Sequence, residues 1–157
     1  MTDTAATTAT AHTTQRVRLT QASDFQFDVH FADALPLLRA DEPPPLGQGA
    51  GPTPVQLLAA SVGNCLSASL LFALRKFKQA PEPITCSVDA EVGRNADGRV
   101  RVLALHARLT LGVPAASLQQ LERVLASFEG YCTVTQSVRA AIPVDVQVVD
   151  ARGERLL

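Results

Sequence analysis

The sequence predicts an α+β fold in which antiparallel hairpin sheets surround one long, buried central helix. Segments of alternating apolar and polar residues stand on both sides of a single uncharged stretch, residues 53–74. Shorter helical segments follow the second group of strands. The expected order is β-β-(β)-α-β-β-α-α-β, in which hairpins and helices are grouped, and this is typical of α+β domains rather than of a doubly wound sheet.

The chain opens with a predicted hairpin. Residues 25–31 (FQFDVHF) alternate cleanly and residues 17–23 alternate roughly, so we expect two half-buried strands joined at Ser23 and Asp24. A short third strand is expected at 35–40. The following segment is rich in Pro and Gly and is expected to be a loop.

Residues 53–77 predict the central helix. Thr53 and Gln56 fit a capping box, and Pro54 suits the first helical position. Apolar residues fall on every side of the helical wheel, so the helix is expected to be buried nearly all round. One chain supplies too little cover for such a helix, which predicts a homodimer. The stretch is also long enough to span a membrane, but polar side chains dilute it and no membrane contact is expected.

Two further strands, two helices and a last strand follow. The strands at 84–92 and 99–111 alternate, and Asp97–Gly98 between them is a hairpin turn signal. Their polar faces carry His106, which is expected on the surface like His30 in the first hairpin. A second helix is expected from Pro114 to about Phe128. A third opens with a capping box of Thr133 and Gln136, and residues 144–149 form the last strand.

Composition limits the domain count and the class of partner. The 157 residues suit one domain over 16–157, preceded by a disordered, Thr- and Ala-rich tail at 1–15. The net charge of −1 without a basic block excludes a nucleic-acid backbone as partner. The tail lacks the pattern of a signal peptide, so a cytoplasmic location is expected. In that reducing compartment cysteines are catalytic or inert rather than disulfide-bonded.

The three cysteines are the candidate functional residues. No metal-spaced cluster and no phosphate-binding loop occurs in the sequence, so neither a metal nor a cofactor is expected. Cys86 lies on an apolar strand face and is expected to be structural. Cys65 lies in the middle of the long helix, and Cys132 precedes a helix N-terminus, where a thiol pKa is lowered. Spacing alone leaves two alternatives open, a Cys65–Cys132 redox pair or three inert thiols.

The segments LLAASVGNCLSASL and YCTVTQSV, with the strand and helix order around them, resemble the OsmC/organic hydroperoxide resistance family over roughly residues 17–150. This resemblance implies an intertwined homodimer with active sites at the interface. It also implies a peroxidase that reduces organic hydroperoxides with a thiol or dithiol reductant. Cys65 would be the peroxidatic cysteine and Cys132 the resolving one. The alternative is a non-enzymatic dimeric module that binds an apolar small molecule and keeps vestigial cysteines.

The sequence departs from the family pattern at the activating groups. Val55 stands where the peroxidase members carry Glu, ten residues before the first cysteine. The Gly-rich hairpin with an activating Arg is missing, and Arg16, Arg18 and Arg39 are the N-terminal arginines. Because Cys65 is expected to be buried in mid-helix without a held cation, its pKa should lie at or above the ordinary value of about 8.5.

Overall fold

The computed structural model describes residues 12–157. Most of the tail expected at residues 1–15 therefore lies outside the described residues, and residues 12–15 have no regular secondary structure. The chain divides into two compact units, Met1–Thr53 and Pro54–Leu157. The single domain expected over residues 16–157 stays a prediction.

The first unit contains a small antiparallel sheet. Its strands pair in the order β1-β2-β3, and Asp24 takes a positive φ of 41° in the turn between the first two. Val29 and Ala40 are its buried apolar residues, 3% and 7% exposed. The three strands predicted for this part of the chain are confirmed: β1 (Arg18–Ser23), β2 (Gln26–His30) and β3 (Leu38–Ala40).

Asp41 organises the loop that follows β3. Its buried carboxylate accepts backbone N–H groups from Glu42, Gln48 and Ala50 at 2.8, 3.1 and 3.0 Å. The amide of Gln26 donates to the same carboxylate at 3.2 Å. These hydrogen bonds hold the pKa of Asp41 below its usual value. The loop is irregular, as expected from its Pro and Gly content, and one carboxylate ties it together.

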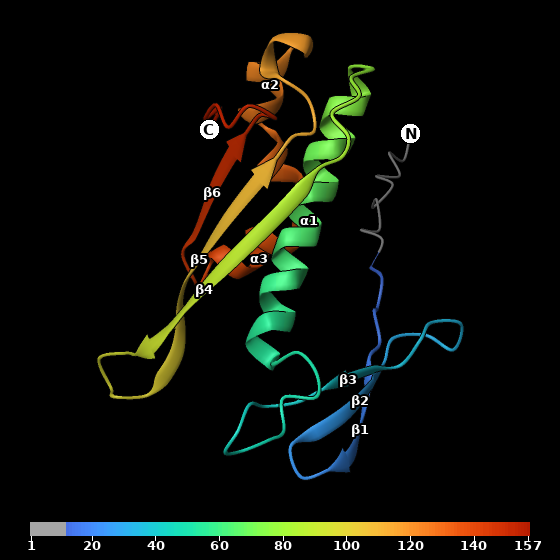
Figure 1. Ribbon diagram of the computed structural model, residues 1–157, viewed down its shortest axis with the longest axis vertical. Helices are drawn as coiled ribbons and strands as arrows, with labels where there is room; N and C mark the ends of the chain where they lie inside the picture. Colours follow the sequence, from blue (N-terminus) through green and yellow to red (C-terminus); the bar gives the residue numbers. More distant parts are fainter. Residues whose placement is uncertain (1–11) are drawn as a thin grey trace, which may run out of the picture. The chain divides into compact units, whose positions relative to one another are not determined.

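The second unit is built on α1 (Pro54–Lys76), which lies along one face of a three-stranded sheet (Figure 1). The helix begins at the proline predicted for its first position, and Arg75 and Lys76 stand in its last turn, where cations complement the helix dipole. A stripe of fully buried side chains faces the core: Val62, Leu66, Leu70 and Leu74.

The sheet of the second unit has one apolar and one polar face. The strands pair in the order β4-β5-β6, antiparallel between the first two and parallel between the last two. Leu105 and Leu109 are fully buried in the core that α1 shares, and the Asp97–Gly98 turn is confirmed, with Gly98 at φ 73°. The bounds are β4 (Thr85–Arg94), β5 (Val100–Thr110) and β6 (Val144–Val149).

The prediction of a single helix from Pro114 to about Phe128 is wrong. The segment is broken where Leu118 is extended and Gln120 takes left-handed backbone angles, φ 58° and ψ 19°. The N–H of Gln119 donates to the side-chain oxygen of Gln79 at 2.8 Å, so a tertiary hydrogen bond replaces a helical one. The elements are η1 (Ala115–Ser117), α2 (Leu121–Leu125) and η2 (Phe128–Tyr131), followed by α3 (Thr133–Arg139).

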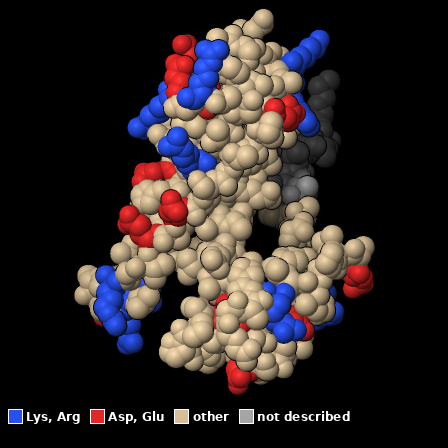
Figure 2. Space-filling view, in the orientation of Figure 1, with Lys and Arg blue, Asp and Glu red and all other residues tan. Residues whose placement is uncertain are grey.

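Within one chain, α1 is not buried all round, as expected from the small amount of covering surface that one chain supplies. The sheet and the short helices pack against part of its circumference, but Phe72 is 66% exposed. Figure 2 shows the surface over the middle of α1 free of charged side chains, in keeping with its sequence. By length and hydropathy alone α1 could cross a membrane. Its packing on a sheet is instead that of the core helix of a soluble fold.

Candidate active site

Cys65 lies halfway along α1 and is half-buried. It packs against the core on the side of the helix where the segment containing Cys132 passes. A helix core position is rigid, since the backbone is held by hydrogen bonds on both sides. The thiol of Cys65 is therefore presented from a fixed backbone.

Cys132 is held by the junction between η2 and α3. Phe128 is fully buried and anchors η2 in the core. The N–H of Cys132 donates to the carbonyl of Glu129, and its own carbonyl accepts the N–H of Gln136, both at 3.0 Å. Arg139 at the other end of α3 pairs with the carboxylate of Glu129 at 2.6 Å. Cys132 is completely buried, so both its backbone and its side chain have a defined place.

The fold brings the two thiols together although they are 67 residues apart. The Cys132 thiol is a hydrogen-bond neighbour of the Cys65 sulfur. The Cys132 Sγ also donates to the hydroxyl of Thr135 at 3.0 Å. Among the described cysteines all three are free thiols. A facing pair of free thiols can pass between dithiol and disulfide.

The start of α3 differs from the predicted capping box. Cys132 rather than Thr133 is the N-cap residue, and its side chain makes no capping hydrogen bond. A Ser, Asp or Thr at this position would accept the N–H groups of the first turn. Here the N–H groups of Val134 and Thr135 instead favour the thiolate of Cys65 and lower its pKa. Because the Cys132 side chain does not cap α3, two backbone donors of its first turn remain available to Cys65.

The pKa of Cys65 is raised above its ordinary value. Burial is the largest cause, and the neighbouring Cys132 adds to it through a hydrogen bond and charge repulsion. The backbone donors of Val134 and Thr135 oppose the shift without reversing it. The direction agrees with the expectation from sequence. The two backbone donors at the start of α3 were not foreseen from the sequence.

Cys86 lies apart from this pair. It borders a hollow of about 410 Å³ between α1 and β4, beside Gly63 and Ser67 of the helix. With 3.6 residues per turn, those two positions lie on the side of α1 opposite Cys65. Burial raises the pKa of Cys86, and the hydroxyl of Ser67 opposes the shift. The sequence prediction of a structural thiol fits this surrounding.

The candidate activating arginines belong to the first unit, whereas Cys65 belongs to the second. Arg39 is paired with Asp28 and donates to Gln26 at 3.1 Å, so its charge is already used within the first sheet. Arg16 and Arg18 border a hollow of about 280 Å³.

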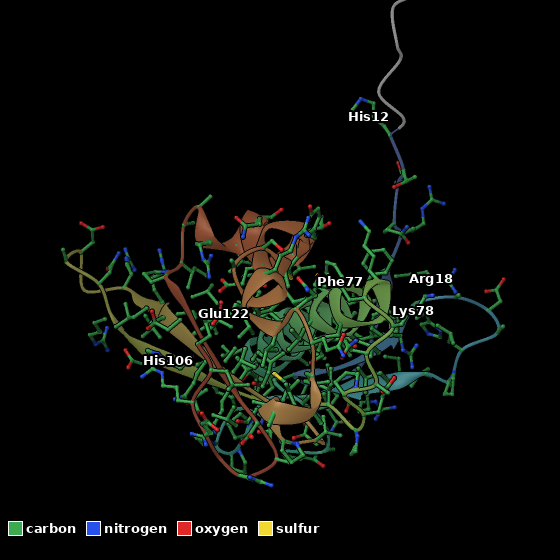
Figure 3. All side chains as sticks on the ribbon, turned by 90° about the horizontal axis from the view of Figure 1, so that it is seen from above. His12, Arg18, Phe77, Lys78, His106 and Glu122 are labelled. Carbon is green, nitrogen blue, oxygen red and sulfur yellow. The ribbon has the colours of Figure 1, made fainter. Side chains whose placement is uncertain are left out.

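His106 lies on the polar face of the sheet, as expected, but is held there on both sides. Its Nε2 is 3.0 Å from Glu91 and its Nδ1 is 3.0 Å from Asp145, which come from the two neighbouring strands. Figure 3 shows it on the outer side of the sheet, away from α1. Within residues 12–157 no group of three His, Cys, Asp or Glu side chains could hold a metal ion.

Thr135 is the site residue that the sequence analysis missed. It is completely buried and contacts Cys132 through its hydroxyl. The available signal was a hydroxyl residue three positions after a cysteine at a helix start, because residues N-cap and N3 face each other in the first turn.

Comparisons with known proteins identify the fold independently. Residues 47–147 match the family of OsmC-like proteins. Among curated proteins there is no match. An OsmC-like protein of unknown function from Vibrio cholerae superimposes with a TM-score of 0.74 at 19% identity, over 88% of this chain and 100% of that one.

Two similar structures carry functional names. One is an organic hydroperoxide resistance protein OsmC from Legionella pneumophila, with a TM-score of 0.65 at 19% identity, over 88% of this chain and 98% of that one. The other is the organic hydroperoxide resistance protein OhrB of Bacillus subtilis, with a TM-score of 0.65 at 13% identity, over 87% and 98%. At these identities the likeness concerns the fold.

Proposed function

We propose that this chain, which belongs to the OsmC-like family, is a thiol-dependent peroxidase acting on organic hydroperoxides. Organic hydroperoxide resistance proteins share its fold. The observation that carries the proposal is the contact between the thiols of Cys65 and Cys132. Two facing thiols, one on a rigid helix and one at a helix start, supply the groups that such a reaction needs.

In the first step Cys65 is the nucleophile. Its thiolate attacks the terminal oxygen of the hydroperoxide, the O–O bond breaks, and the alkoxide leaves as an alcohol after taking up a proton. Cys65 becomes a sulfenic acid, a two-electron oxidation of the sulfur. The N–H groups of Val134 and Thr135 favour negative charge on this sulfur before the attack.

In the second step Cys132 resolves the sulfenic acid. Its sulfur attacks the Cys65 sulfur, the S–O bond breaks, and the hydroxyl leaves as water with the thiol proton. The product is a Cys65–Cys132 disulfide, which protects Cys65 from irreversible over-oxidation. A thiol or dithiol reductant restores both thiols by exchange and is itself oxidised to a disulfide.

The proposed substrate is an apolar hydroperoxide. A cleft of about 360 Å³ lies between α1, α2 and η2, with walls that include Phe72, Phe77 and Tyr131. Phe72 stands seven residues after Cys65 and therefore lies on the same side of α1. Tyr131 directly precedes Cys132. Arg123 lies over the Phe77 ring, 5.5 Å from its centroid, at one wall of this cleft.

The proposed assembly is a homodimer in the cytoplasm. A second copy would cover the exposed side of α1, including Phe72. A reducing compartment would supply the thiol reductant. The second candidate function is a dimeric module that binds an apolar small molecule in the Phe72–Tyr131 cleft without using its cysteines, and the cleft itself favours it.

Peroxide treatment followed by peptide mapping separates the two functions. With tert-butyl hydroperoxide, the peroxidase should lose two thiols per chain and gain a Cys65–Cys132 disulfide, while Cys86 stays reduced. A binding module should keep three free thiols. A bridge that includes Cys86, or no bridge at all, would contradict the proposed peroxidase.

Three serine variants assign the steps. Cys65→Ser should abolish peroxide consumption. Cys132→Ser should allow one turnover and leave Cys65 as a sulfenic or sulfinic acid. Cys86→Ser is the matched control, because it removes a thiol on the opposite side of α1 and should leave turnover unchanged.

A further inference from the structure

Thr135 bonds to the sulfur of Cys132 and influences the pKa of Cys65. It is the third residue of α3 and is 0% exposed. Its hydroxyl accepts a hydrogen bond from Cys132 Sγ at 3.0 Å, and its backbone N–H acts on the sulfur of Cys65. One buried residue therefore bonds to the resolving thiol with its side chain and, with its backbone N–H, lowers the pKa of the peroxidatic thiol.

The hydroxyl of Thr135 is used differently from those of nearby helical serines. Ser67 in α1 and Ser137 in α3 each donate to the carbonyl four residues earlier, at 2.8 Å. Such back-bonding is the common use of a hydroxyl inside a helix. The hydroxyl of Thr135 instead bonds to the thiol of Cys132. Since Cys132 is completely buried, removal of this hydroxyl would leave its S–H group with only the sulfur of Cys65 as a hydrogen-bond neighbour.

We propose that Thr135 is a positioning residue of the resolving step, with its hydroxyl holding the Cys132 thiol in the orientation that faces Cys65. This inference rests on the proposed function. In the dithiol state the hydroxyl oxygen of Thr135 accepts a hydrogen bond from the Cys132 S–H. As the S–H bond breaks, the hydroxyl can rotate about its C–O bond and donate a hydrogen bond to the Cys132 sulfur. The proton leaves with the sulfenic hydroxyl as water, and Thr135 keeps its own proton.

The two contacts predict an effect on one step only. Attack on the peroxide uses the Cys65 sulfur, whose pKa Thr135 lowers through its backbone N–H. A side-chain substitution keeps that N–H. Disulfide closure uses the Cys132 sulfur, which Thr135 touches through its hydroxyl. Loss of the hydroxyl should therefore slow closure and spare the first oxidation.

Thr135→Val and Thr135→Ser form the test pair. Valine has nearly the same shape as threonine but lacks the hydroxyl, whereas serine keeps the hydroxyl and loses a methyl group. In single-turnover reactions with tert-butyl hydroperoxide, closure should be about tenfold slower in Thr135→Val. The share of Cys65 found as sulfinic acid at high peroxide should rise accordingly. Thr135→Ser should restore both values, and the rate of the first oxidation should stay within about twofold in both variants.

A second oxidant keeps the test independent of peroxidase activity. Diamide oxidises two neighbouring thiols to a disulfide and is reduced to a hydrazine, so it closes the Cys65–Cys132 bridge without a sulfenic acid. If the unsubstituted protein ignores peroxide, the proposed function fails, and the diamide rates still decide the role of Thr135. Slower closure by diamide in Thr135→Val with recovery in Thr135→Ser supports the inference.

Equal closure rates in all three folded proteins would overturn it, as would a failure of serine to restore closure. The S–H stretching band of Cys132, measured by Raman spectroscopy in a Cys65→Ser, Cys86→Ser background, provides a check that packing defects do not mimic. Loss of the hydrogen bond in Thr135→Val should move the band to higher frequency. An unchanged band would mean that the thiol is held by something other than Thr135.

Discussion

The Cys65 sulfur receives opposing influences from the residues around it. Burial and the neighbouring Cys132 favour the neutral thiol, and the N–H groups of Val134 and Thr135 favour the thiolate. Together these effects raise the pKa of Cys65. Two backbone donors from a short helix offset only part of the burial, because neutral donors stabilise a charge less than an ion does.

A raised pKa predicts a steep pH dependence of peroxide reduction. With a pKa at or above the ordinary value of about 8.5, at most about 3% of Cys65 is thiolate at pH 7. The single-turnover rate should therefore rise almost tenfold from pH 7 to pH 8 and continue to rise toward pH 9. Stopped-flow oxidation by tert-butyl hydroperoxide measures it.

Val55→Glu alone should not flatten this profile, since a carboxylate without an arginine beside the sulfur adds only repulsion. A rate already constant between pH 7 and 9 would mean that a cation reaches Cys65. Arg16, Arg18 and Arg39 would then be substituted in turn.

Asp150 is the second buried carboxylate that joins backbone segments. It accepts N–H groups from Ala115, Arg152 and Glu154 at 2.9, 2.8 and 2.9 Å, which tie the C-terminal turn to the segment after β5. These bonds, that of Ala115 first, lower its pKa. A lowered folded pKa means that its stabilisation is present above the unfolded value of about 3.9 and is lost as the pH falls through the folded pKa.

Asp150→Asn should lower the Tm at pH 7 by about 5 °C, because the neutral amide offers one acceptor oxygen and places a donor against the backbone N–H groups. The deficit should shrink as the pH falls from about 4 toward the lowered folded pKa, because the unfolded carboxylate takes up a proton in this range before the native one does. Asp33→Asn is the matched control, since the exposed Asp33 side chain makes no hydrogen bond within residues 12–157. A deficit that does not change with pH would contradict this role.

At the scale of elements, the contact between α1 and β4 depends on Gly63. A Cβ at this position would lie 2.8 Å from Val88 Cγ2 and 3.3 Å from Cys86 Sγ. The Val88 side chain is β-branched and stiff, so it cannot easily withdraw. The absence of a side chain at Gly63 thus allows the helix to approach the edge strand closely.

Gly63→Ala should destabilise the protein by about 1 kcal/mol, since overpacking costs about 1–3 kcal/mol and alanine recovers up to about 1 kcal/mol of helix propensity. In a Val88→Ala background the same substitution should be neutral or stabilising. Urea unfolding at one fixed protein concentration measures both cases. Stabilisation by Gly63→Ala with Val88 intact would show that helix and strand are packed less closely.

At the scale of the molecule, the exposed side of α1 supports the proposed homodimer. Phe72 and Tyr131 are 66% and 73% exposed on the second unit, an unusual position for large aromatic side chains. Light scattering should give a homodimer at micromolar concentration, with an interface above roughly 2,000 Å² as in obligate pairs. A stable folded monomer would contradict it.

Phe72→Glu should weaken this dimer, because it places a charge in the covered surface. Val100→Glu is a matched control, since Val100 is 55% exposed at the start of β5, beside the hairpin turn. Sedimentation velocity over a concentration series should show dissociation for the first variant only. The same loss in both variants would mean that general destabilisation, rather than this side of α1, is responsible.

The sequence by itself determined the strands and the long helix, and it marked the cysteines as candidate functional residues. These follow from local periodicity, such as the alternation at residues 25–31, and from helix-start and turn residues such as Pro54 and Asp97–Gly98. The same local signals misjudged residues 114–128. There a hydrogen bond between Gln119 and Gln79, 40 residues apart, competes with the helix, and periodicity carries no information about such a partner.

Only the tertiary structure decided the surroundings of Cys65. The resemblance named Cys132 as its partner, but the contact of the two thiols, the backbone donors of α3 and the place of Thr135 depend on how η2 and α3 pack on α1. Likewise Asp41 and Asp150 look like ordinary polar residues in the sequence, and their role comes from N–H groups up to 35 residues away. Contacts between distant segments set these positions, because burial makes each polar group depend on a partner that the folded chain supplies.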